Sequence, residues 1–169
     1  MASILSDSEI RKLIESPKPL VSGYIDLERQ LQPAGFELTL AEVFSFKGFG
    51  SLGFEDKDRK LPAFKPIRLS AEKFTRLPSG AYMVRYNEEV RLPSDLSALI
   101  FPRSSLMRSG AILYTAVWDR GRGQGLLNVY NPHGIRLKLN ARIGQLVFLR
   151  LSRPSRRLYR GIYQREGLA

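Results

Sequence analysis

The sequence predicts a mainly β domain of the barrel or jelly-roll type, preceded by one short helix. Short runs of apolar and β-branched residues recur along the chain, and glycine or proline separates them. No helical periodicity is sustained beyond Pro19. Many short strands at such spacing are typical of antiparallel barrels and sandwiches. At 169 residues with 43% hydrophobic content, the chain has the size of one domain with a real core.

The expected helix lies close to the N-terminus. Ser6 and Glu9 have the three-residue spacing of a capping box. Apolar residues follow at helical intervals, so we expect an amphipathic helix over about residues 7–15. Prolines at positions 17 and 19 end it, and residues 1–20 therefore form an N-terminal helix segment.

The remaining elements are strands, one exposed insertion and a C-terminal arm. Residues 47–66 are glycine-rich, then charged, then proline-rich, so we expect an exposed loop or loose hairpin there. Residues 152–169 form a basic arm. No linker or repeat divides the chain, so residues 1–169 are expected to be a single domain. The expected strands cover 36–46, 81–86, 97–101, 111–117, 126–130, 135–139 and 145–151.

Composition excludes several kinds of chemistry. The chain has no cysteine and a single histidine, His133, so thiolate catalysis, disulfides and a histidine-rich metal centre are excluded. No apolar run approaches the roughly 20 residues of a membrane span, and the N-terminus lacks the basic region of a signal peptide. We therefore expect a cytoplasmic protein that does not bind a membrane.

The positive charge of the C-terminal half indicates an anionic ligand. The net charge is +11, and residues 96–165 contain thirteen Arg or Lys but only one carboxylate, Asp119. Nucleic acid and a small phosphorylated ligand both fit such a surplus. Aromatic residues are sparse among these cations, which disfavours nucleic acid. One carboxylate within a positive field fits a hydrolase that takes a proton from water beside a phosphate ester.

The segment from Arg103 to Arg108 concentrates the donors for such a ligand. Two arginines and two serines, Ser104 and Ser105, lie within six residues directly after a proline. An ordinary polar turn between strands would have a similar composition. If residues 105–108 form one helical turn, the hydroxyl and guanidinium donors are close enough to surround an anion.

Residues 102–110 resemble the second conserved motif of the trimeric dUTPase and dCTP deaminase superfamily, and residues 159–164 resemble the C-terminal arm of its archaeal and deaminase-like members. Together the motifs resemble those of an archaeal-type dUTPase. Residues 88–96 resemble the strand and turn that precede this motif. The other motifs of the superfamily have counterparts in the same order, at residues 33–40, 115–121, 142–146 and 159–164. This resemblance implies a distorted jelly-roll (β-clip) domain that assembles as a homotrimer, with active sites between subunits.

For a dUTPase, the resemblance implies that Asp119 activates the water that attacks the α-phosphorus of dUTP, releasing dUMP and pyrophosphate. It implies Mg²⁺ as cofactor, held by the phosphates rather than by direct protein ligands, with Glu37 or Asp119 as candidates for a contact through water. The substrate-binding residues that it implies are Arg103, Ser104, Ser105, Arg108 and Gln145 for the triphosphate, Thr115, Ala116 and Val117 for uracil, and Tyr163 and Gln164 in an arm that closes over the nucleotide.

Two other functions remain open on this fold. A dCTP deaminase, or a bifunctional enzyme, needs a glutamate about ten residues after Asp119, but Val129 stands there. A non-catalytic regulator would bind nucleotide or nucleic acid through the basic tail, which runs from Arg150 to Arg160. The chain also departs from the dUTPase pattern, because Glu37 replaces an aspartate and Arg122 replaces the tyrosine that rejects ribose. Candidates for that missing tyrosine are Tyr114 and Tyr130.

Overall fold

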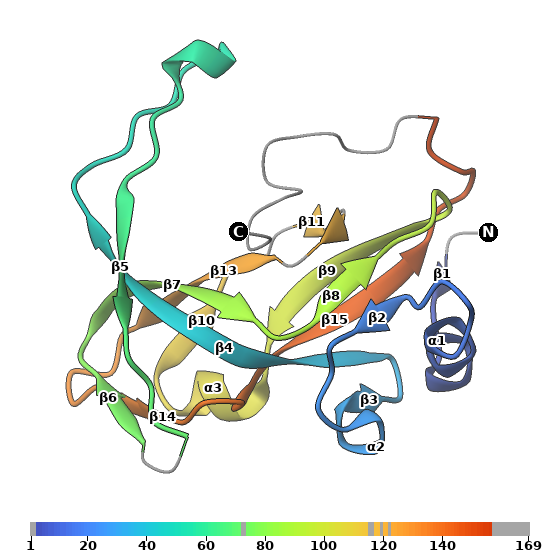
Figure 1. Cartoon of the computed structure of the whole chain (residues 1–169), viewed down its shortest axis with the longest axis horizontal. Helices are drawn as coiled ribbons and strands as arrows, with labels where there is room; N and C mark the ends of the chain where they lie inside the picture. The colour runs from blue at the N-terminus through green and yellow to red at the C-terminus, as the bar shows by residue number, and fades with distance from the viewer. Residues whose placement is uncertain (1–2, 72–73, 115–116, 119, 122, 157–169) are drawn as a thin grey trace.

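A strongly curled antiparallel sheet forms most of the molecule, and a short helix lies at its N-terminal end (Figure 1). The computed structural model describes residues 3–71, 74–114, 117–118, 120–121 and 123–156. The prediction of a mainly β, jelly-roll-like domain is confirmed.

Within the described residues, the largest sheet has the strand order β10-β13-β7-β4-β15-β9-β11. Its strands are β4 (Gly35–Lys47), β7 (Gly80–Tyr86), β9 (Leu96–Pro102), β10 (Ala111–Leu113), β11 (Val117–Trp118), β13 (Gln124–Val129) and β15 (Arg142–Arg150). Short strands extend it: β1 (Ser3–Ile4) pairs with β15, whereas β3 (Leu31–Gln32) and β5 (Ala63–Ile67) pair with β4. A three-stranded sheet contains β2 (Val21–Ser22), β8 (Glu89–Arg91) and β12 (Arg120–Gly121). A two-stranded sheet contains β6 (Thr75–Leu77) and β14 (Ile135–Leu137).

The core follows from strand alternation. In β9, Leu96, Ala98 and Ile100 are buried, whereas the residues between them are half-exposed. Side chains at every second position of a strand point to the same face, so this pattern places one face of β9 in the core. Tyr86 and Trp118 pack ring to ring within the core, with their centroids 5.6 Å apart.

The predicted N-terminal helix is present as α1 (Asp7–Ile14). Its capping box is complete: the Ser6 hydroxyl accepts a hydrogen bond from the Glu9 amide, and the Glu9 carboxylate accepts one from the Ser6 amide at 3.0 Å. This second bond is the main reason that the pKa of Glu9 is lowered. Ile10 and Ile14 are buried, so the apolar face of α1 packs on the core.

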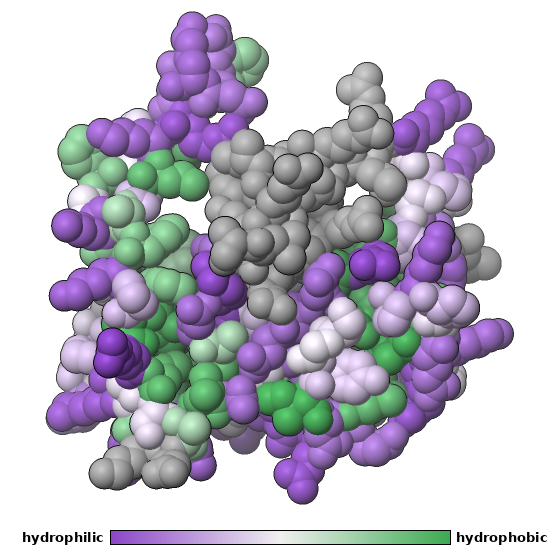
Figure 2. Space-filling model, in the orientation of Figure 1, coloured by the Kyte–Doolittle hydropathy of each residue, from purple (hydrophilic) through white to green (hydrophobic). Residues whose placement is uncertain are grey.

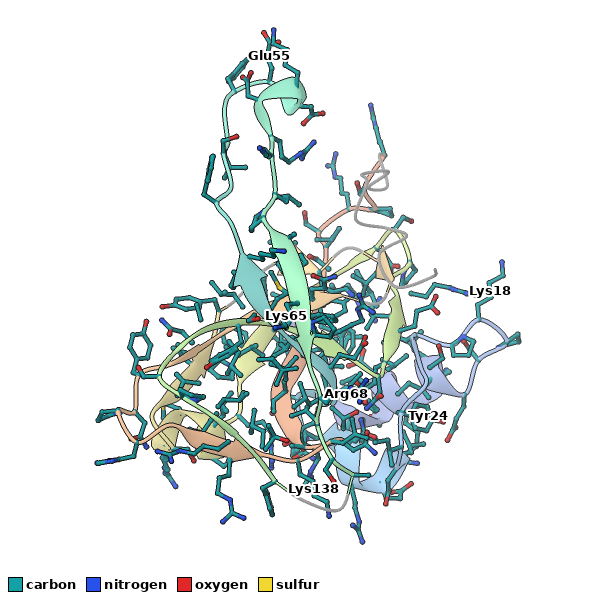
Figure 3. All side chains as sticks on the ribbon, turned by 60° about the vertical axis from the view of Figure 1, so that its left-hand side comes forward. Lys18, Tyr24, Glu55, Lys65, Arg68 and Lys138 are labelled. Carbon is teal, nitrogen blue, oxygen red and sulfur yellow. The ribbon has the colours of Figure 1, made fainter. Side chains whose placement is uncertain are left out.

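Residues 47–66 belong to a long hairpin that projects away from the domain (Figures 1 and 3). The far end of β4 pairs with β5, and beyond them Ser51 and Lys60 form an isolated bridge. A short 3₁₀ helix, η1 (Asp56–Asp58), lies at the tip beside Glu55. Figure 2 shows mainly hydrophilic residues at this end of the molecule. Several apolar side chains are also exposed along the hairpin: Phe49, Leu52, Phe54 and Leu61.

The structure corrects some expected boundaries. Residues 111–117 do not form one strand, because β10 pairs with β13 whereas β11 pairs with β9. Residues 138 and 139 lie outside the strand expected to reach them, since β14 ends at Leu137. The expected strand at 145–151 instead begins at Arg142. A further helix of four residues, α2 (Leu27–Gln30), is capped by Asp26 and was not expected.

The helices of the described residues are all short. None of them is long and apolar enough to cross a membrane.

We expect the Ser6→Ala variant to lower the free energy of unfolding by about 1 kcal/mol, because it removes the acceptor for the Glu9 amide at the start of α1. Urea unfolding measures this change. Ser6→Asn is the control, since asparagine is also a good N-cap residue and should retain most of the stability. Equal losses in the two variants would contradict a capping role for the side chain.

Candidate active site

Antiparallel pairing brings three distant segments together within the main sheet. Glu37 in β4 lies opposite Gln145 in β15, and Gln145 lies opposite Phe101 in β9. Directly opposed residues project from the same face of a sheet, so the Glu37 and Gln145 side chains lie on one face. Arg103 follows the end of β9, and Arg142 begins β15. The strand register thus gathers residues of three sequence motifs.

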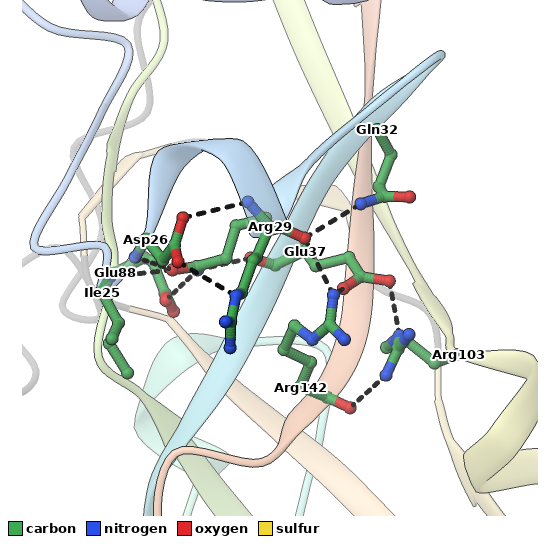
Figure 4. Close-up of polar contacts among 9 residues, drawn as sticks. Ile25, Asp26, Arg29, Gln32, Glu37, Glu88, Arg103 and Arg142 are labelled. Atoms are coloured by element: carbon green, nitrogen blue, oxygen red, sulfur yellow. Dashed lines mark hydrogen bonds and ion pairs between the residues drawn. The ribbon is translucent and has the colours of Figure 1, made fainter.

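Glu37 forms the centre of this cluster (Figure 4). Its side chain is only 5% exposed, and its two oxygens pair with different arginines. Oε1 lies 2.5 Å from Nε of Arg103, and Oε2 lies 2.9 Å from Nη1 of Arg142. The contact at Oε2 is an ion pair without hydrogen-bond alignment, since this oxygen accepts no hydrogen bond from the described residues. One buried carboxylate therefore holds two guanidinium groups and leaves the cluster with a net positive charge.

Main-chain carbonyls hold the two arginines in place. Arg142 donates from Nη1 to the carbonyl of Arg29 at 2.8 Å, and Arg103 donates from Nη1 to the carbonyl of Arg142 at 3.4 Å. The Arg103 amide also donates to the carbonyl of Ile143. No partner for Nη2 of Arg103 or Arg142 is found within the described residues. Both side chains are partly exposed, so these N–H groups can donate hydrogen bonds to an anion that enters from solvent.

The serine-rich segment forms α3 (Ser104–Arg108), which begins one residue earlier than the helical turn expected from the sequence. Leu106 is buried and anchors α3 to the core, whereas Ser104, Ser105 and Arg108 are exposed. Gly110 follows with a φ of +76°, and a side chain there would lie 2.7 Å from Cβ of Asn131. A glycine is therefore required where the chain leaves α3.

Gln145 is held beside Glu37 by a close approach of two strands. A Cβ atom on Gly35 would lie 2.3 Å from the carbonyl oxygen of Leu146 and 2.8 Å from Nε2 of Gln145. Only glycine fits at position 35. The half-buried Gln145 side chain thus packs against the backbone of β4 and is not a plain solvent-facing strand residue.

A cavity of about 510 Å³ lies between α3 and the chain around β14. Ser105 and Arg142 both line it, together with Ser109 and Arg136. A hydroxyl from the serine-rich segment and a guanidinium from β15 therefore face the same hollow. Hydroxyl and guanidinium donors on one hollow suit a phosphate group.

Several residues expected in the site lie outside the described residues. These are Asp119, Thr115, Ala116, Tyr163 and Gln164. Arg122, which stands in place of the tyrosine that rejects ribose, also lies outside them. Val117 is described: it is exposed, and it pairs with Leu99 at the β9 edge of the main sheet.

Tyr114 directly follows β10, and Tyr130 directly follows β13, the strand with which β10 pairs. Both side chains are exposed, and their hydroxyls form a short hydrogen bond with each other. This hydrogen bond is the main cause of the raised pKa of Tyr130. The two candidates for the tyrosine that rejects ribose are thus joined by a hydrogen bond beside β10 and β13.

Sequence reasoning did not select Arg142 as a site residue. The signal available was its position in the motif at 142–146, three residues before Gln145. Its contact with Glu37 depends on a register shift between Arg142 and Gly144, where β15 is irregular against β4. Such an irregularity is typical of bulges, which redirect side chains, and it cannot be read from alternation alone.

The fold and the sequence are similar to those of known proteins. Residues 4–151 match the family model described as dCTP deaminase-like, and the chain belongs to this family. A solved structure of 2′-deoxycytidine 5′-triphosphate deaminase from Agrobacterium tumefaciens has a similar fold, with a TM-score of 0.69 and 23% sequence identity. That match covers 88% of this chain and 48% of the other.

Two archaeal proteins are more similar to this chain in sequence than the deaminase is, and both are named as deoxyuridine triphosphate nucleotidohydrolases. The chain is 46% identical to the "Probable deoxyuridine 5′-triphosphate nucleotidohydrolase" of Methanosarcina mazei, over 97% of this chain and 98% of the relative. It is 36% identical to the "Deoxyuridine 5′-triphosphate nucleotidohydrolase" of Methanocaldococcus jannaschii, over 81% of this chain and 88% of the relative.

Replacing Arg142 with Met should lower the free energy of unfolding by about 1–3 kcal/mol, because the buried Glu37 carboxylate loses one of its two cations. Chemical denaturation measures the effect. Arg91→Met, at an exposed arginine of β8 with no described ion pair, should change stability by less than about 0.5 kcal/mol. Similar stabilities of the two variants would show that Glu37 does not need Arg142.

Proposed function

We propose that this chain is a dUTP diphosphatase, which hydrolyses dUTP to dUMP and pyrophosphate. The observation that carries the proposal is the likeness, over nearly the whole chain, to archaeal relatives named as deoxyuridine triphosphate nucleotidohydrolases. The described site supports it, since Arg103 and Arg142 flank the buried Glu37 carboxylate and the exposed serines of α3 follow Arg103 directly.

The triphosphate would bind to the cations and hydroxyls at α3. Arg103, Ser104, Ser105 and Arg108 supply these donors, and Gln145 adds an amide. We add Arg142 to this set, because it shares Glu37 with Arg103 and lines the same cavity as Ser105. A planar guanidinium can donate two parallel hydrogen bonds to a phosphate, so two adjacent arginines suit neighbouring phosphate groups.

The chemical step requires a base for water. In our proposal Asp119 takes a proton from a water molecule whose oxygen attacks the α-phosphorus, and the bond to the bridging oxygen breaks so that pyrophosphate leaves. The arginines of the site would stabilise the negative charge that develops on the phosphates. The residues 115–117 would contact uracil, and Tyr163 and Gln164 would cover the bound nucleotide.

Selection of deoxyribose needs another side chain in this protein, because Arg122 stands where dUTPases usually carry a tyrosine. Tyr114 and Tyr130 are exposed beside the paired strands β10 and β13, and their hydroxyls are hydrogen-bonded to each other. We propose that this pair contacts the sugar in place of the missing tyrosine.

Mg²⁺ is the metal that we propose for this reaction, since it bridges phosphate oxygens and neutralises their charge. Glu37 does not fit as its ligand, because both carboxylate oxygens already face arginines. Within the described residues, no group of three acidic or histidine side chains could hold a metal ion. The ion would therefore be held by the substrate phosphates and water, with Asp119 as the candidate for a contact through water.

Deamination of dCTP is the weaker alternative. Val129 occupies the position where a deaminase needs its glutamate, and this side chain is buried in β13 opposite Ala111. An apolar side chain cannot transfer a proton to or from cytosine.

A nucleic-acid-binding regulator is also less well supported. Arg150, at the start of the basic tail, is engaged within the domain: Nη1 pairs with Asp95 at 3.0 Å and Nη2 with Glu9 at 3.4 Å. An arginine with two carboxylate partners contributes little to binding of a polyanion. Arg157 and Arg160 of the same tail lie outside the described residues.

Product analysis with dUTP, dCTP and UTP in the presence of Mg²⁺ tests the proposed reaction. We expect dUMP and pyrophosphate from dUTP alone. Replacing Asp119 with Asn should reduce the rate by at least roughly a hundredfold, because the base is lost, while nucleotide binding is retained. Asp58→Asn, at the tip of the exposed hairpin, is the control and should leave the rate unchanged.

Three outcomes would contradict this assignment in different ways. Release of ammonia from dCTP would indicate a deaminase. Equal rates with UTP would exclude the proposed sugar contact. Binding of nucleotide without any turnover would favour the regulator.

We further propose that the chain assembles as a homotrimer. Exposed apolar residues on neighbouring segments support a subunit contact: Phe101 at the end of β9, Met107 in α3 and Val117 in β11. Light scattering should give three times the chain mass of 19.2 kDa. A stable monomer with full activity would exclude a site built between subunits.

A further inference from the structure

A second buried carboxylate, Glu88, lies behind the site and makes no contact with the arginines. It follows β7, and it is completely buried. Its oxygens accept three hydrogen bonds from two residues. Oε1 accepts from Nε2 of Gln30 at 2.7 Å and from the hydroxyl of Thr39 at 2.6 Å, whereas Oε2 accepts from the amide of Thr39 at 2.9 Å.

These contacts fill a gap in the strand pairing of β4. On the edge away from β15, β4 pairs with β3 at Gly35 and Phe36 and with β7 from Leu40 onward. Between these two partners, the backbone of residues 37–39 has no neighbouring strand. Buried backbone groups must still be hydrogen-bonded. The Thr39 carbonyl accepts from the backbone amide of Asn87 at 3.1 Å, and side chains supply the partners for the Glu37 carbonyl and the Thr39 amide.

Gln30 and Glu88 provide those partners together (Figure 4). Nε2 of Gln30 donates to the carbonyl of Glu37 at 2.9 Å as well as to Glu88, and Oε1 of Gln30 accepts from the amides of Ile25 and Asp26. The carbonyl of Glu37 is thereby fixed through Gln30, and the amide of Thr39 is fixed by Glu88 directly. The backbone that directly follows the Glu37 side chain, from the Glu37 carbonyl to the Thr39 amide, is held by one buried network.

We propose that Glu88 is a positioning residue for phosphate binding: through Gln30 and Thr39 it sets the backbone of Glu37, whose carboxylate in turn places Arg103 and Arg142. The inference rests on the proposed function, because it assumes that these arginines bind the triphosphate. Its route has two steps, from Glu88 to the backbone of β4 and from Glu37 to the guanidinium groups.

The chemistry of the network requires an acid at position 88. All three contacts are donated to Glu88, and a carboxylate has only acceptors. Glutamine would turn one of these acceptors into an NH₂ group that faces a donor. Burial raises the pKa of Glu88, and the hydrogen bonds from Thr39 and Gln30 oppose this rise. An apolar side chain at position 88 would remove the acceptor of the buried Thr39 amide and one acceptor of Gln30, so the network needs the carboxylate despite the cost of burying it.

The test uses Glu88→Gln with Glu89→Gln as the matched control, since Glu89 is the adjacent residue and has no described side-chain hydrogen bond or ion pair. Inorganic triphosphate is the probe for the arginines, and its affinity is measured by calorimetry. We expect Glu88→Gln to weaken triphosphate binding roughly tenfold, because a small displacement of positioned groups has large effects. The KM for dUTP should rise by a similar factor, and Glu89→Gln should change neither quantity.

A double mutant separates positioning from stability. If Glu88 acts through Glu37, its replacement should have no further effect on triphosphate affinity in a Glu37→Gln background, although it still lowers the melting temperature. Additive losses of affinity would overturn the proposed route. A lower melting temperature with unchanged affinity and KM in Glu88→Gln alone would overturn the positioning role itself.

A milder pair of variants covers the case in which Glu88→Gln does not fold. Thr39→Val removes the hydroxyl donor to Glu88, whereas Thr39→Ser retains it. Weaker triphosphate binding in the valine variant, restored in the serine variant, supports the proposal, and equal affinities overturn it. Failure of the wild type to hydrolyse dUTP while it still binds triphosphate would count against the proposed function alone. If the wild type does not bind triphosphate, both proposals fall.

Discussion

A carboxylate shielded from water needs cations and hydrogen-bond donors around it, and Glu37 places this demand at the centre of the site. Arg103 and Arg142 satisfy it, although they come from different parts of the chain. They meet at Glu37 because β15 pairs with β4 on one side and with β9 on the other. A one-residue slip in either pairing would turn the side chains to the opposite face of the sheet. The charge cluster and the strand register therefore depend on each other.

The excess of positive charge in this cluster has a functional consequence. Two guanidinium groups beside one carboxylate repel each other, and the serines of α3 add donors without adding negative charge. An anion with several charges relieves this repulsion when it binds. Glu37 and two main-chain carbonyls already hold both guanidinium groups in place. The side chains would therefore lose little conformational entropy when a ligand binds.

The sequence predicted the regular parts of this fold better than its irregular parts. Alternation located the long strands β4, β7, β9 and β15, and the capping box located α1 to within one residue. Elements of two to four residues, such as α2 and β3, were not predicted, because segments this short carry no periodicity. The split of residues 111–117 was missed for another reason: alternation shows which face a residue occupies but not which strand it pairs with.

The same distinction applies to the site. The donors of α3 could be selected from the sequence because they are contiguous and chemically unusual. Glu88 could not be selected, since the first of two adjacent glutamates at the start of a strand looks like a solvated turn residue. Its role in the fold arises because residues 37–39 of β4 pair with β15 on one edge but have no partner strand on the other. A gap in strand pairing is a property of the folded sheet, and it requires acceptors and donors of particular kinds. In our proposal Glu88 fills this gap next to the charged cluster, and it thereby belongs to the functional machinery without contacting the ligand.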